Sequence, residues 1–519
     1  MTLSHSSKNR IALAAVCLTA LMFGLEISSV PVILPTLEKV LHGNFKDMQW
    51  IMNAYTIACT TVLMAAGTLA DRYGRKRIFV ISLALFGITS LLCGLAQDAP
   101  VLIVSRFLQG MSGGAMLICL TAVLSHQFQE GVERSKAFAV WGVVFGVGLG
   151  FGPIIGGMIV VLSSWHWVFL VHVPLTVLTL MLVFSSVDES SDPHAKKLDI
   201  LGIVTLSMSV FGLTYFITQG PDLGFTSNAA VGILVATATG FIIFIFVEKI
   251  NPHPMFDFSV FRIRKFSGAI IGSIGMNFSF WPFMIYLPIY FQSGLGYDIV
   301  TAGLSLLAYT LPTLVIPPLA ERLSLRYQPR IVIPLGLFTI GLGFILLKYG
   351  SAADHASWLT MLPGSLLAGM GLGLTNTPVT NTTTGSVPTN RAGMASGIDM
   401  SARLISLAIN IALMGFILLE GILSSLESAF PEFPDTLQLR SLAKKIASGS
   451  FTSLKQDFPE LFSLDSSGTI VHAALMHGFG LVMLYGGIGV WVLAAISFMI
   501  FGPEKALSNK IGRKITESL

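Results

Sequence analysis

The stretch GTLADRYGRKR, residues Gly67–Arg77, decides the fold. It is a short charged segment between two long apolar runs, centred near Thr61 and Phe86. A glycine permits a tight turn, and basic residues suit the water at one membrane face. The stretch therefore predicts two membrane-spanning helices joined by a tight loop. The residues of interest in this segment are Gly67, Asp71, Arg72, Gly74, Arg75 and Lys76.

A second stretch, AERLSLRYQPR at Ala320–Arg330, resembles the first. Both contain an Arg-Tyr pair followed closely by a basic residue, but Leu325 and Gln328 stand where the first copy has Asp71 and Gly74. This weak internal repeat predicts two related halves. Parallel halves with a binding site between them near the membrane midplane are a recurring plan of transporters.

The composition places the chain in a membrane. Of its 519 residues 53% are hydrophobic and only 11% are charged, whereas soluble domains carry roughly 25% charged residues. Apolar runs of about 20 residues, the length that spans a bilayer, predict an all-α polytopic membrane protein with 14 transmembrane helices. Their expected centres are Met22, Thr61, Phe86, Gly113, Gly148, Val177, Met208, Phe241, Asn277, Pro312, Gly341, Ala368, Ile409 and Gly489.

The distribution of Lys and Arg predicts the orientation. Of 31 such residues, 22 fall in the even-numbered loops and the termini and seven in the odd-numbered loops. Both termini are therefore expected in the cytoplasm, and the net charge of +4 reflects this asymmetry rather than binding to nucleic acid. The first apolar run is too long for a cleaved signal peptide, so we expect it to span the membrane.

The chain divides into three expected regions. Residues 1–185 form an N-terminal six-helix bundle, 186–250 two additional transmembrane helices with linkers, and 251–519 a C-terminal six-helix bundle. The last region includes a long extracytoplasmic loop, 421–477, in which Ala429–Leu464 mixes charged and apolar residues. This part either forms short amphipathic helices or simply tethers two spans, and Glu420 is expected at the outer end of its helix.

Several stretches together resemble one known family. The loop Gly67–Arg77 looks like the signature loop of the major facilitator superfamily, and the others resemble its fourteen-helix drug:proton antiporter branch, the EmrB/QacA type. These others are LEISSVPVILP (Leu25–Pro35), SRFLQGMSGGA with Arg106, Gln109 and Gly110, Gly146–Gly157, WHWVFLVHVP (Trp165–Pro174), FDFSVFRIRKF and RAGMASGIDMSAR. The resemblance implies two six-helix bundles plus two extra helices, and export of drugs in exchange for protons.

The sequence departs from the branch at four positions. Glu26 stands where the branch usually has Asp, Pro31 where it has Asn, and His166 and His172 where it has Arg and Asn. The two histidines lie near the expected start of a span, and we interpret them as interface anchors rather than proton sensors.

The stretch GVVFGVGLGFGPIIGGM, Gly142–Met158, contains seven glycines in 17 residues. Membrane helices associate by close packing, which small residues allow, and a proline permits a bend. We therefore expect a packing and hinge surface here, which the resemblance identifies as the antiporter motif. The residues concerned are Gly146, Gly148, Gly150, Gly152, Pro153, Gly156 and Gly157.

Charged residues inside spans are candidates for function. Glu26 is the leading candidate for binding a proton or a cationic substrate, and the alternative is a hydrogen bond that only positions helices. By resemblance Arg106 faces the cavity and affects proton transfer. Asp399 and Arg403 lie four residues apart on one helix face. They are either a second pair that couples transport to protons or a structural pair. Candidate cavity residues are Asn53, Tyr55, Gln109, Asn277, Trp281, Tyr286, Tyr290, Asn376 and Asn410.

These features predict a secondary transporter and not an enzyme, since neither a catalytic triad nor a phosphate-binding loop is apparent. We expect no cofactor and no metal, because none of the four cysteines has a partner at metal-ligand spacing. The expected partners are a small-molecule substrate, protons and the lipid bilayer of the inner membrane. We expect the protein to be a monomer, and the sequence leaves open whether it binds a periplasmic adaptor. The alternatives are export of one endogenous metabolite, such as a siderophore or lipid precursor, a non-transporting receptor, and a channel or uniporter.

Overall fold

The computed structural model describes residues 5–128, 131–191, 199–252, 254, 258–353, 355–387, 392–431, 436–448 and 468–502. Within these residues the regular structure is helical, without a strand. The N-terminal group of helices is α1 (His5–Val40), α2 (Phe45–Tyr73), α3 (Arg75–Gly94), α4 (Ala99–Gln127), α5 (Gly131–Leu162), α6 (His166–Leu170) and α7 (His172–Ser186). Two further helices follow, α8 (Ile200–Leu223) and α9 (Asn228–Ile250).

The C-terminal group begins after a short 3₁₀ helix at Phe258–Arg262. Its members are α10 (Arg264–Phe278), α11 (Phe280–Ile289), a π-helical turn (Tyr290–Gly294), α12 (Ile299–Thr310), α13 (Pro312–Val315), α14 (Pro317–Tyr327), α15 (Pro329–Ser351), α16 (Trp358–Gly385), α17 (Ala392–Ala429), α18 (Thr436–Ser448) and α21 (Thr469–Phe501). The breaks at Pro312 and Pro317 divide one span into α12, α13 and α14, because proline cannot donate the backbone hydrogen bond of a continuing helix.

Among the described residues, twelve helices are long and apolar enough to cross a membrane, or thirteen if the bent pair Ile299–Val315 and Pro317–Tyr327 is one span. Each of the fourteen expected centres lies in a helix. However, α2 is absent from the twelve helices that satisfy both length and hydropathy. The predicted all-helical polytopic class is confirmed, whereas the count of fourteen is not.

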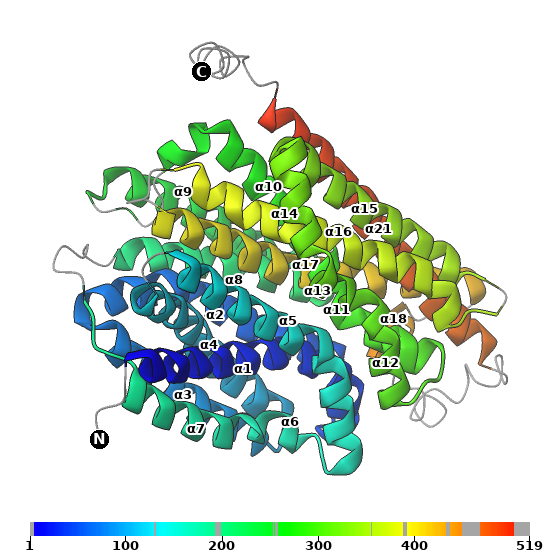
Figure 1. Cartoon of the computed structure of the whole chain (residues 1–519). Helices are drawn as coiled ribbons and strands as arrows, with labels where there is room; N and C mark the ends of the chain where they lie inside the picture. Colours follow the sequence, from blue (N-terminus) through cyan, green and yellow to red (C-terminus); the bar gives the residue numbers. More distant parts are fainter. Residues whose placement is uncertain are drawn as a thin grey trace.

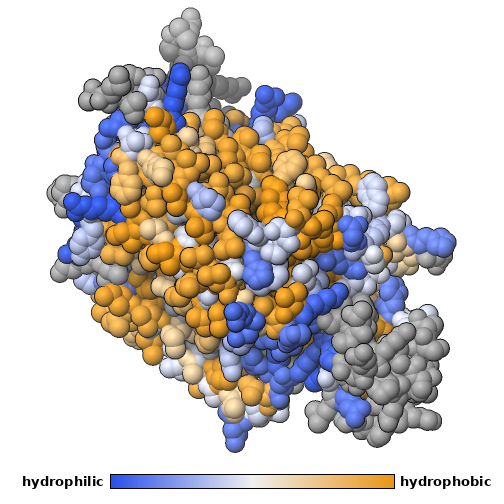
Figure 2. Space-filling view, turned by 90° about the horizontal axis from the view of Figure 1, so that it is seen from below, coloured by the Kyte–Doolittle hydropathy of each residue, from blue (hydrophilic) through white to orange (hydrophobic). Residues whose placement is uncertain are grey.

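The surface agrees with a bilayer environment. Figure 2 shows a broad hydrophobic face, with hydrophilic residues gathered toward its edges. Large apolar side chains point outward on α8 and α9, where Leu201, Met208 and Phe246 are 66%, 65% and 64% exposed. Because water would penalise this exposure, the face is suited to lipid tails.

The helices run roughly alongside one another in two groups (Figure 1). Within the N-terminal group α1 packs on α5 and α2 on α4, and within the C-terminal group α15 packs on both α16 and α21. Helix α8 contacts α2 from one group and α17 from the other. We call the side where α1 begins and α21 ends the terminal side, and the opposite side, which carries α18, the α18 side.

The two groups are joined from the middle of the molecule to the α18 side. Gln49 of α2 donates to the Tyr286 hydroxyl at 3.0 Å, and Gln292 donates to the carbonyl of Val32 at 2.9 Å. One apolar cluster contains residues of both groups at this level, among them Leu34, Phe45, Phe291 and Leu306. The α18 side is therefore closed in this conformation.

The internal repeat is present in the backbone. A single residue with positive φ separates α2 from α3 (Gly74, +113°) and α14 from α15 (Gln328, +68°). In each copy the Arg-Tyr pair stacks, with the guanidinium carbon 5.4 Å from the Tyr73 ring centre and 5.3 Å from that of Tyr327. The expected tight loop is thus one residue long, because α2 continues through Arg72 to Tyr73.

The segment between the last two long helices differs from the expectation in one respect. Glu420 does not end a helix, because α17 continues to Ala429, and its carboxylate lies 3.0 Å from the guanidinium of Arg440 on α18. Helix α18 is amphipathic and buries Leu439, Leu442 and Ile446. The short amphipathic helix anticipated within Ala429–Leu464 is therefore present.

Candidate functional site

The centre of the N-terminal group contains a fully buried ion pair. Glu26 of α1 and Arg106 of α4 both have side chains with no exposure, and Nη1 of Arg106 donates to Oε1 of Glu26. The same guanidinium donates to Oε1 of Gln109 at 2.7 Å and to the carbonyl of Ile51 at 3.1 Å. A buried charge is tolerated when it is paired and hydrogen bonded. Loss of either charge would leave the other one buried without a partner of opposite charge.

His172 of α7 completes this cluster. Its Nδ1 lies 3.4 Å from Oε2 of Glu26 and 3.3 Å from the carbonyl of Phe169, and its Nε2 lies 3.2 Å from the carbonyl of Met22. Carbonyl and carboxylate oxygens accept hydrogen bonds and do not donate them. The ring of His172 therefore has an acceptor oxygen beside each of its two nitrogens.

His172 was therefore misinterpreted from the sequence. An interface anchor would have an accessible ring, whereas this ring is 1% exposed. The residue stands in a predominantly apolar run, and only the packing of α7 against α1 brings it to Glu26. The departure of this position from the family pattern was the one available signal.

Tyr55 separates the cluster from a central cavity. Its ring lies under the guanidinium of Arg106, 4.2 Å from ring centre to carbon. Helix α4 packs closely on the backbone of α2 at this point. A Cβ on Gly110 of α4 would stand 2.3 Å from the carbonyl oxygen of Tyr55. Tyr55 therefore touches the buried ion pair on one side and the cavity on the other.

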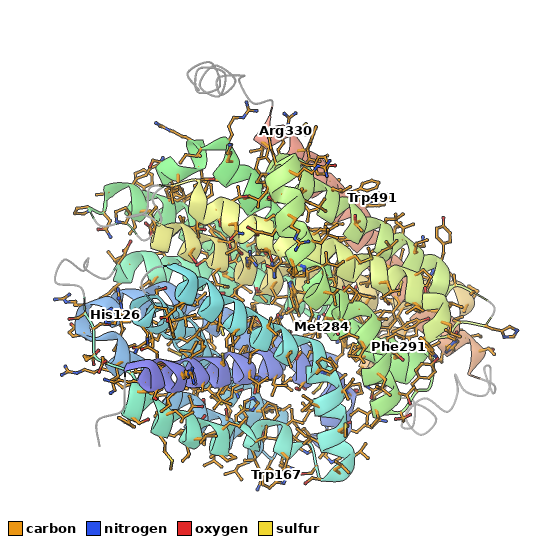
Figure 3. The ribbon with its side chains drawn as sticks, in the orientation of Figure 1. His126, Trp167, Met284, Phe291, Arg330 and Trp491 are labelled. Atoms are coloured by element: carbon orange, nitrogen blue, oxygen red, sulfur yellow. The ribbon has the colours of Figure 1, made fainter. Side chains whose placement is uncertain are left out.

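The central cavity lies between the two helix groups, with about 490 Å³ of empty volume including the open space at its mouth. Met284 of α11, labelled in Figure 3, lies where the N-terminal helices meet the C-terminal ones. The lining is mostly apolar and aromatic, as ligand sites commonly are. It consists of Phe23, Ile27, Pro31, Met52, Tyr55, Thr56, Cys59, Trp281, Met284, Ile285, Leu404, Leu407 and Ile411.

Two of the nine candidate cavity residues, Tyr55 and Trp281, line this cavity. Gln109 belongs to the Arg106 cluster, and Tyr286 bonds with Gln49 across the two groups. The remaining polar groups lie elsewhere. Asn277 donates to the Ser273 carbonyl, Asn376 accepts from Arg403, Asn410 accepts from Tyr485, and the buried hydroxyl of Tyr290 and amide of Asn53 have no hydrogen-bond partner among the described residues.

Arg106 and Glu26 do not line the cavity in this conformation. The reason is the register of α1, on which Phe23 and Ile27 face the cavity while Glu26 faces α4 and α7.

Asp399 and Arg403 form the expected pair one helical turn apart on α17, with 3.0 Å between Nη2 and Oδ2. The pair is deeper than a surface bridge, since Asp399 is 3% exposed and accepts a hydrogen bond from Ser273 of α10. Arg403 also donates to Asn376 and Thr380 of α16. The pair joins three helices of the C-terminal group.

The glycines of α5 form two faces. Gly148, Gly152 and Gly156 face α1, where Ser28 and Ser29 donate to the carbonyls of Gly148 and Gly152, both at 3.0 Å. Gly146 and Gly150 face Leu314 of α13, and Gly157 faces the carbonyl of Ile299. The carbonyl of Pro153 meets Gly303 of α12. One helix thus packs closely on both groups, as a surface between moving halves requires.

The signature segment is held by a residue that the sequence did not single out. The carboxylate of Glu189 accepts from the backbone N–H of Lys76 at 3.0 Å and of Arg77 at 3.2 Å, and Arg75 N–H bonds with the Ser190 carbonyl at 2.8 Å. A carboxylate at a helix N-terminus is favourable. Glu189 therefore caps α3. The side chain of Asp71 lies outside the described part of the structure.

Gly74→Ala is expected to destabilise this junction by about 1–3 kcal/mol, the cost of an unfavourable backbone conformation. Its φ is +113°, and an added Cβ would lie 2.6–2.9 Å from the carboxylate of Glu189. Gly67→Ala is the matched control, since its Cβ would meet only Ile118 Cγ2, at 3.3 Å. Unfolding by SDS titration in mixed micelles measures both variants, and equal losses would contradict the role of Gly74.

Comparison with known proteins fits this arrangement. The sequence profile described as Major Facilitator Superfamily matches residues 16–410. The chain belongs to this superfamily. It is 31% identical over 437 residues to the multidrug resistance protein Stp of Mycobacterium tuberculosis, covering 84% of this chain and 81% of Stp. It is 27% identical to the tetracenomycin C resistance and export protein of Streptomyces glaucescens, covering 93% and 90%.

The fold of this superfamily member also resembles a solved one. The crystal structure of the human organic anion transporter MFSD10 (TETRAN) matches with a TM-score of 0.59 at 12% identity, covering 95% of this chain and 99% of that one. The chain is therefore a multi-pass membrane transporter that acts on small molecules, and not an enzyme.

Proposed function

We propose that this transporter exports lipophilic or cationic drugs in exchange for protons. The single observation that carries the proposal is the buried Glu26–Arg106–His172 cluster beside a cavity lined by aromatic and apolar side chains. Buried ionisable residues in a membrane are costly and mark ion pathways. Aromatic faces suit organic cations. The curated relatives named above, which are called drug resistance and export proteins, support drugs as the substrate class.

The coupling runs through Tyr55. While Glu26 is ionised it bonds with Arg106, whose guanidinium stacks on the Tyr55 ring at the cavity wall. A proton on Glu26 removes one charge of the pair and frees Arg106 and Tyr55 to move. A ligand shifts a two-state equilibrium only by its differential affinity for the two states. Proton and drug therefore exclude one another through the position of Tyr55.

The terminal side is cytoplasmic in this proposal, because Lys and Arg concentrate there. The conformation described is then closed toward the outside. Export requires the bonds of Gln49 with Tyr286 and of Gln292 with Val32 to break while α5 slides on α12 and α13. The protein acts in the inner membrane as a monomer. For an uncharged drug, one proton entering across 100 mV supplies about 2.3 kcal/mol, enough for roughly a 50-fold drug gradient. Exchange for a monovalent cation moves no net charge, so the pH gradient alone drives it.

Proteoliposomes with an imposed pH gradient test the proposal. Wild type is expected to move ethidium and protons in opposite directions, and Glu26→Gln to slow gradient-driven ethidium movement about tenfold or more, a barrier increase of about 1.4 kcal/mol. Asp399→Asn is the matched carboxylate control and is expected to retain coupling. If Asp399→Asn loses coupling and Glu26→Gln keeps it, Asp399 is the coupling residue. If wild type moves no dye and dye causes no proton flux, export of one dedicated metabolite replaces the drug proposal.

A further inference from the structure

A second cavity lies on the α18 side, apart from the central one. It has about 260 Å³ of empty volume, including the open space at its mouth, and is bounded by α2, α8, α17 and α18. Its walls are mostly apolar, with a few polar and cationic groups. The lining residues are Phe45, Lys46, Gln49, Ile217, Thr218, Gly415, Phe416, Leu419 and Lys444.

One wall residue presents an unused polar group. Thr218 is 4% exposed, and its Oγ1 has no hydrogen-bond partner in the part of the chain that the structure describes. A buried hydroxyl without a partner costs roughly 1–3 kcal/mol. The neighbouring threonine of the same helix, Thr214, bonds with the Val210 carbonyl at 2.9 Å. The unpartnered hydroxyl therefore belongs to the cavity wall and is available to a bound molecule.

The charges at this cavity favour an anion. Nζ of Lys46 and Nζ of Lys444 both bond with the single carboxylate of Asp222, the latter at 2.6 Å. The nearby Arg440 is already paired with Glu420. Two ammonium groups on one carboxylate leave a positive charge at the edge of an apolar space. Lys46 is 13% exposed at its side chain, so water screens this charge only in part.

The carboxylate of Asp222 remains ionised at ordinary pH. Burial raises the pKa of Asp222, whereas hydrogen bonds from Lys444 and Lys46 lower it. The lowering effects together are larger, so the pKa lies below the usual value of about 3.9. A depressed carboxyl pKa contributes stability that is present above the usual pKa and is lost as the pH falls through the lower value. Asp222 therefore stays ionised throughout the physiological range, whereas burial lowers the pKa of Lys46.

We propose that the second cavity binds an amphipathic anion, with its charged head at Lys46 and Lys444 and its hydrocarbon chain among the apolar side chains. The walls come from α2 of the N-terminal group and α17 of the C-terminal group. A bound anion thus bridges the two groups where they must separate, and it favours the closed α18 side. This inference rests on the cavity and its charges, and it holds whether or not drugs or protons are the transported species.

Photolabelling in lipid nanodiscs tests the site. The probe is decanoic acid with a diazirine near the end of its chain, added to the full-length protein in phosphatidylcholine discs, and labelled peptides are mapped by mass spectrometry. Label is expected near Ile217 and Phe416. Decanoate is expected to compete, whereas decyltrimethylammonium, which has the opposite charge, is not.

Two variants separate binding from folding. Lys444→Gln is expected to reduce labelling about tenfold, as the loss of about 1.4 kcal/mol of binding free energy does, and Thr218→Val to reduce it to a smaller extent. Lys39→Gln is the matched control, since Lys39 is exposed near the same face and does not line the cavity. Gel filtration verifies that all three variants are folded.

The outcomes are distinct. Label confined to the central cavity near Trp281, or label unchanged in both Lys444→Gln and Thr218→Val, would overturn the proposal. Label lost from the second cavity in these two variants and retained in Lys39→Gln supports it. Adding phosphatidylglycerol to the discs then identifies the source, because competition points to a membrane lipid and its absence to a free amphiphile. None of these results depends on ethidium or proton transport.

Discussion

Arg106→Met is expected to abolish transport and to reduce the free energy of unfolding by about 3–5 kcal/mol, the cost of leaving one partner of a buried pair alone. The variant removes the donor to Glu26, to Gln109 and to the Ile51 carbonyl. The remaining carboxylate has no exposure, and among the described residues the His172 ring is the one basic group left within 4 Å of it. SDS-titration unfolding and ethidium transport measure the two effects.

The double variant Glu26→Gln, Arg106→Met distinguishes a charge effect from a packing effect. Removing both charges avoids a lone buried ion, so the double variant is expected to be more stable than Arg106→Met alone, while transport stays lost. Arg403→Met is the matched control. It is expected to cost less, because Arg403 is only partly buried and its partners lie nearer the helix end. A double variant less stable than Arg106→Met would contradict the account of the ion pair.

Gly156→Ala is expected to produce the second large effect. An added Cβ would lie 2.8 Å from Ser29 Cβ and 3.0 Å from its carbonyl oxygen. The backbone of α1 cannot rotate away, so α1 and α5 must separate, at an expected cost of about 1–3 kcal/mol for overpacking. Because Ser29 lies one turn beyond Glu26, the displacement also reaches the cluster, and transport is expected to fall sharply.

Gly142→Ala is the matched control in the same helix. Nothing lies within 4 Å of a Cβ at this position, and Ala is better than Gly in a helix by about 1 kcal/mol. This variant is expected to retain transport and to be as stable as wild type or slightly more stable. If both alanine variants behave alike, in unfolding and in the passive proton leak of proteoliposomes, close packing of α1 on α5 is not essential.

The sequence predicted individual features of the site better than their combination. Glu26 and Arg106 stood out because charge is rare in apolar runs, but 80 positions separate them, and nothing in the sequence states that they pair. Glycines spaced one turn apart predicted one packing surface on α5, whereas the structure has two. Which face meets α1 and which meets α13 depends on helix packing, which the spacing does not specify.

Three features could not be predicted, each for a physical reason. His172 lies among apolar residues, and its contact with Glu26 depends on the rotation of α7 about its axis. Glu189 follows the end of α7, and its capping of α3 depends on how the chain turns back there. Four of the nine candidates for the cavity, Gln109, Tyr286, Asn376 and Asn410, instead bond with neighbouring helices, because a buried amide or hydroxyl bonds with the nearest available partner.

Proton release on drug binding tests the central claim most directly. Purified protein in weakly buffered detergent solution near pH 7 is mixed with ethidium, and a soluble indicator records the pH. Wild type is expected to release protons as the drug binds, since drug and proton exclude one another at a single cluster. Glu26→Gln is expected to bind ethidium and release none. Release that is absent from wild type, or undiminished in Glu26→Gln, would contradict proton coupling at the Glu26–Arg106–His172 cluster.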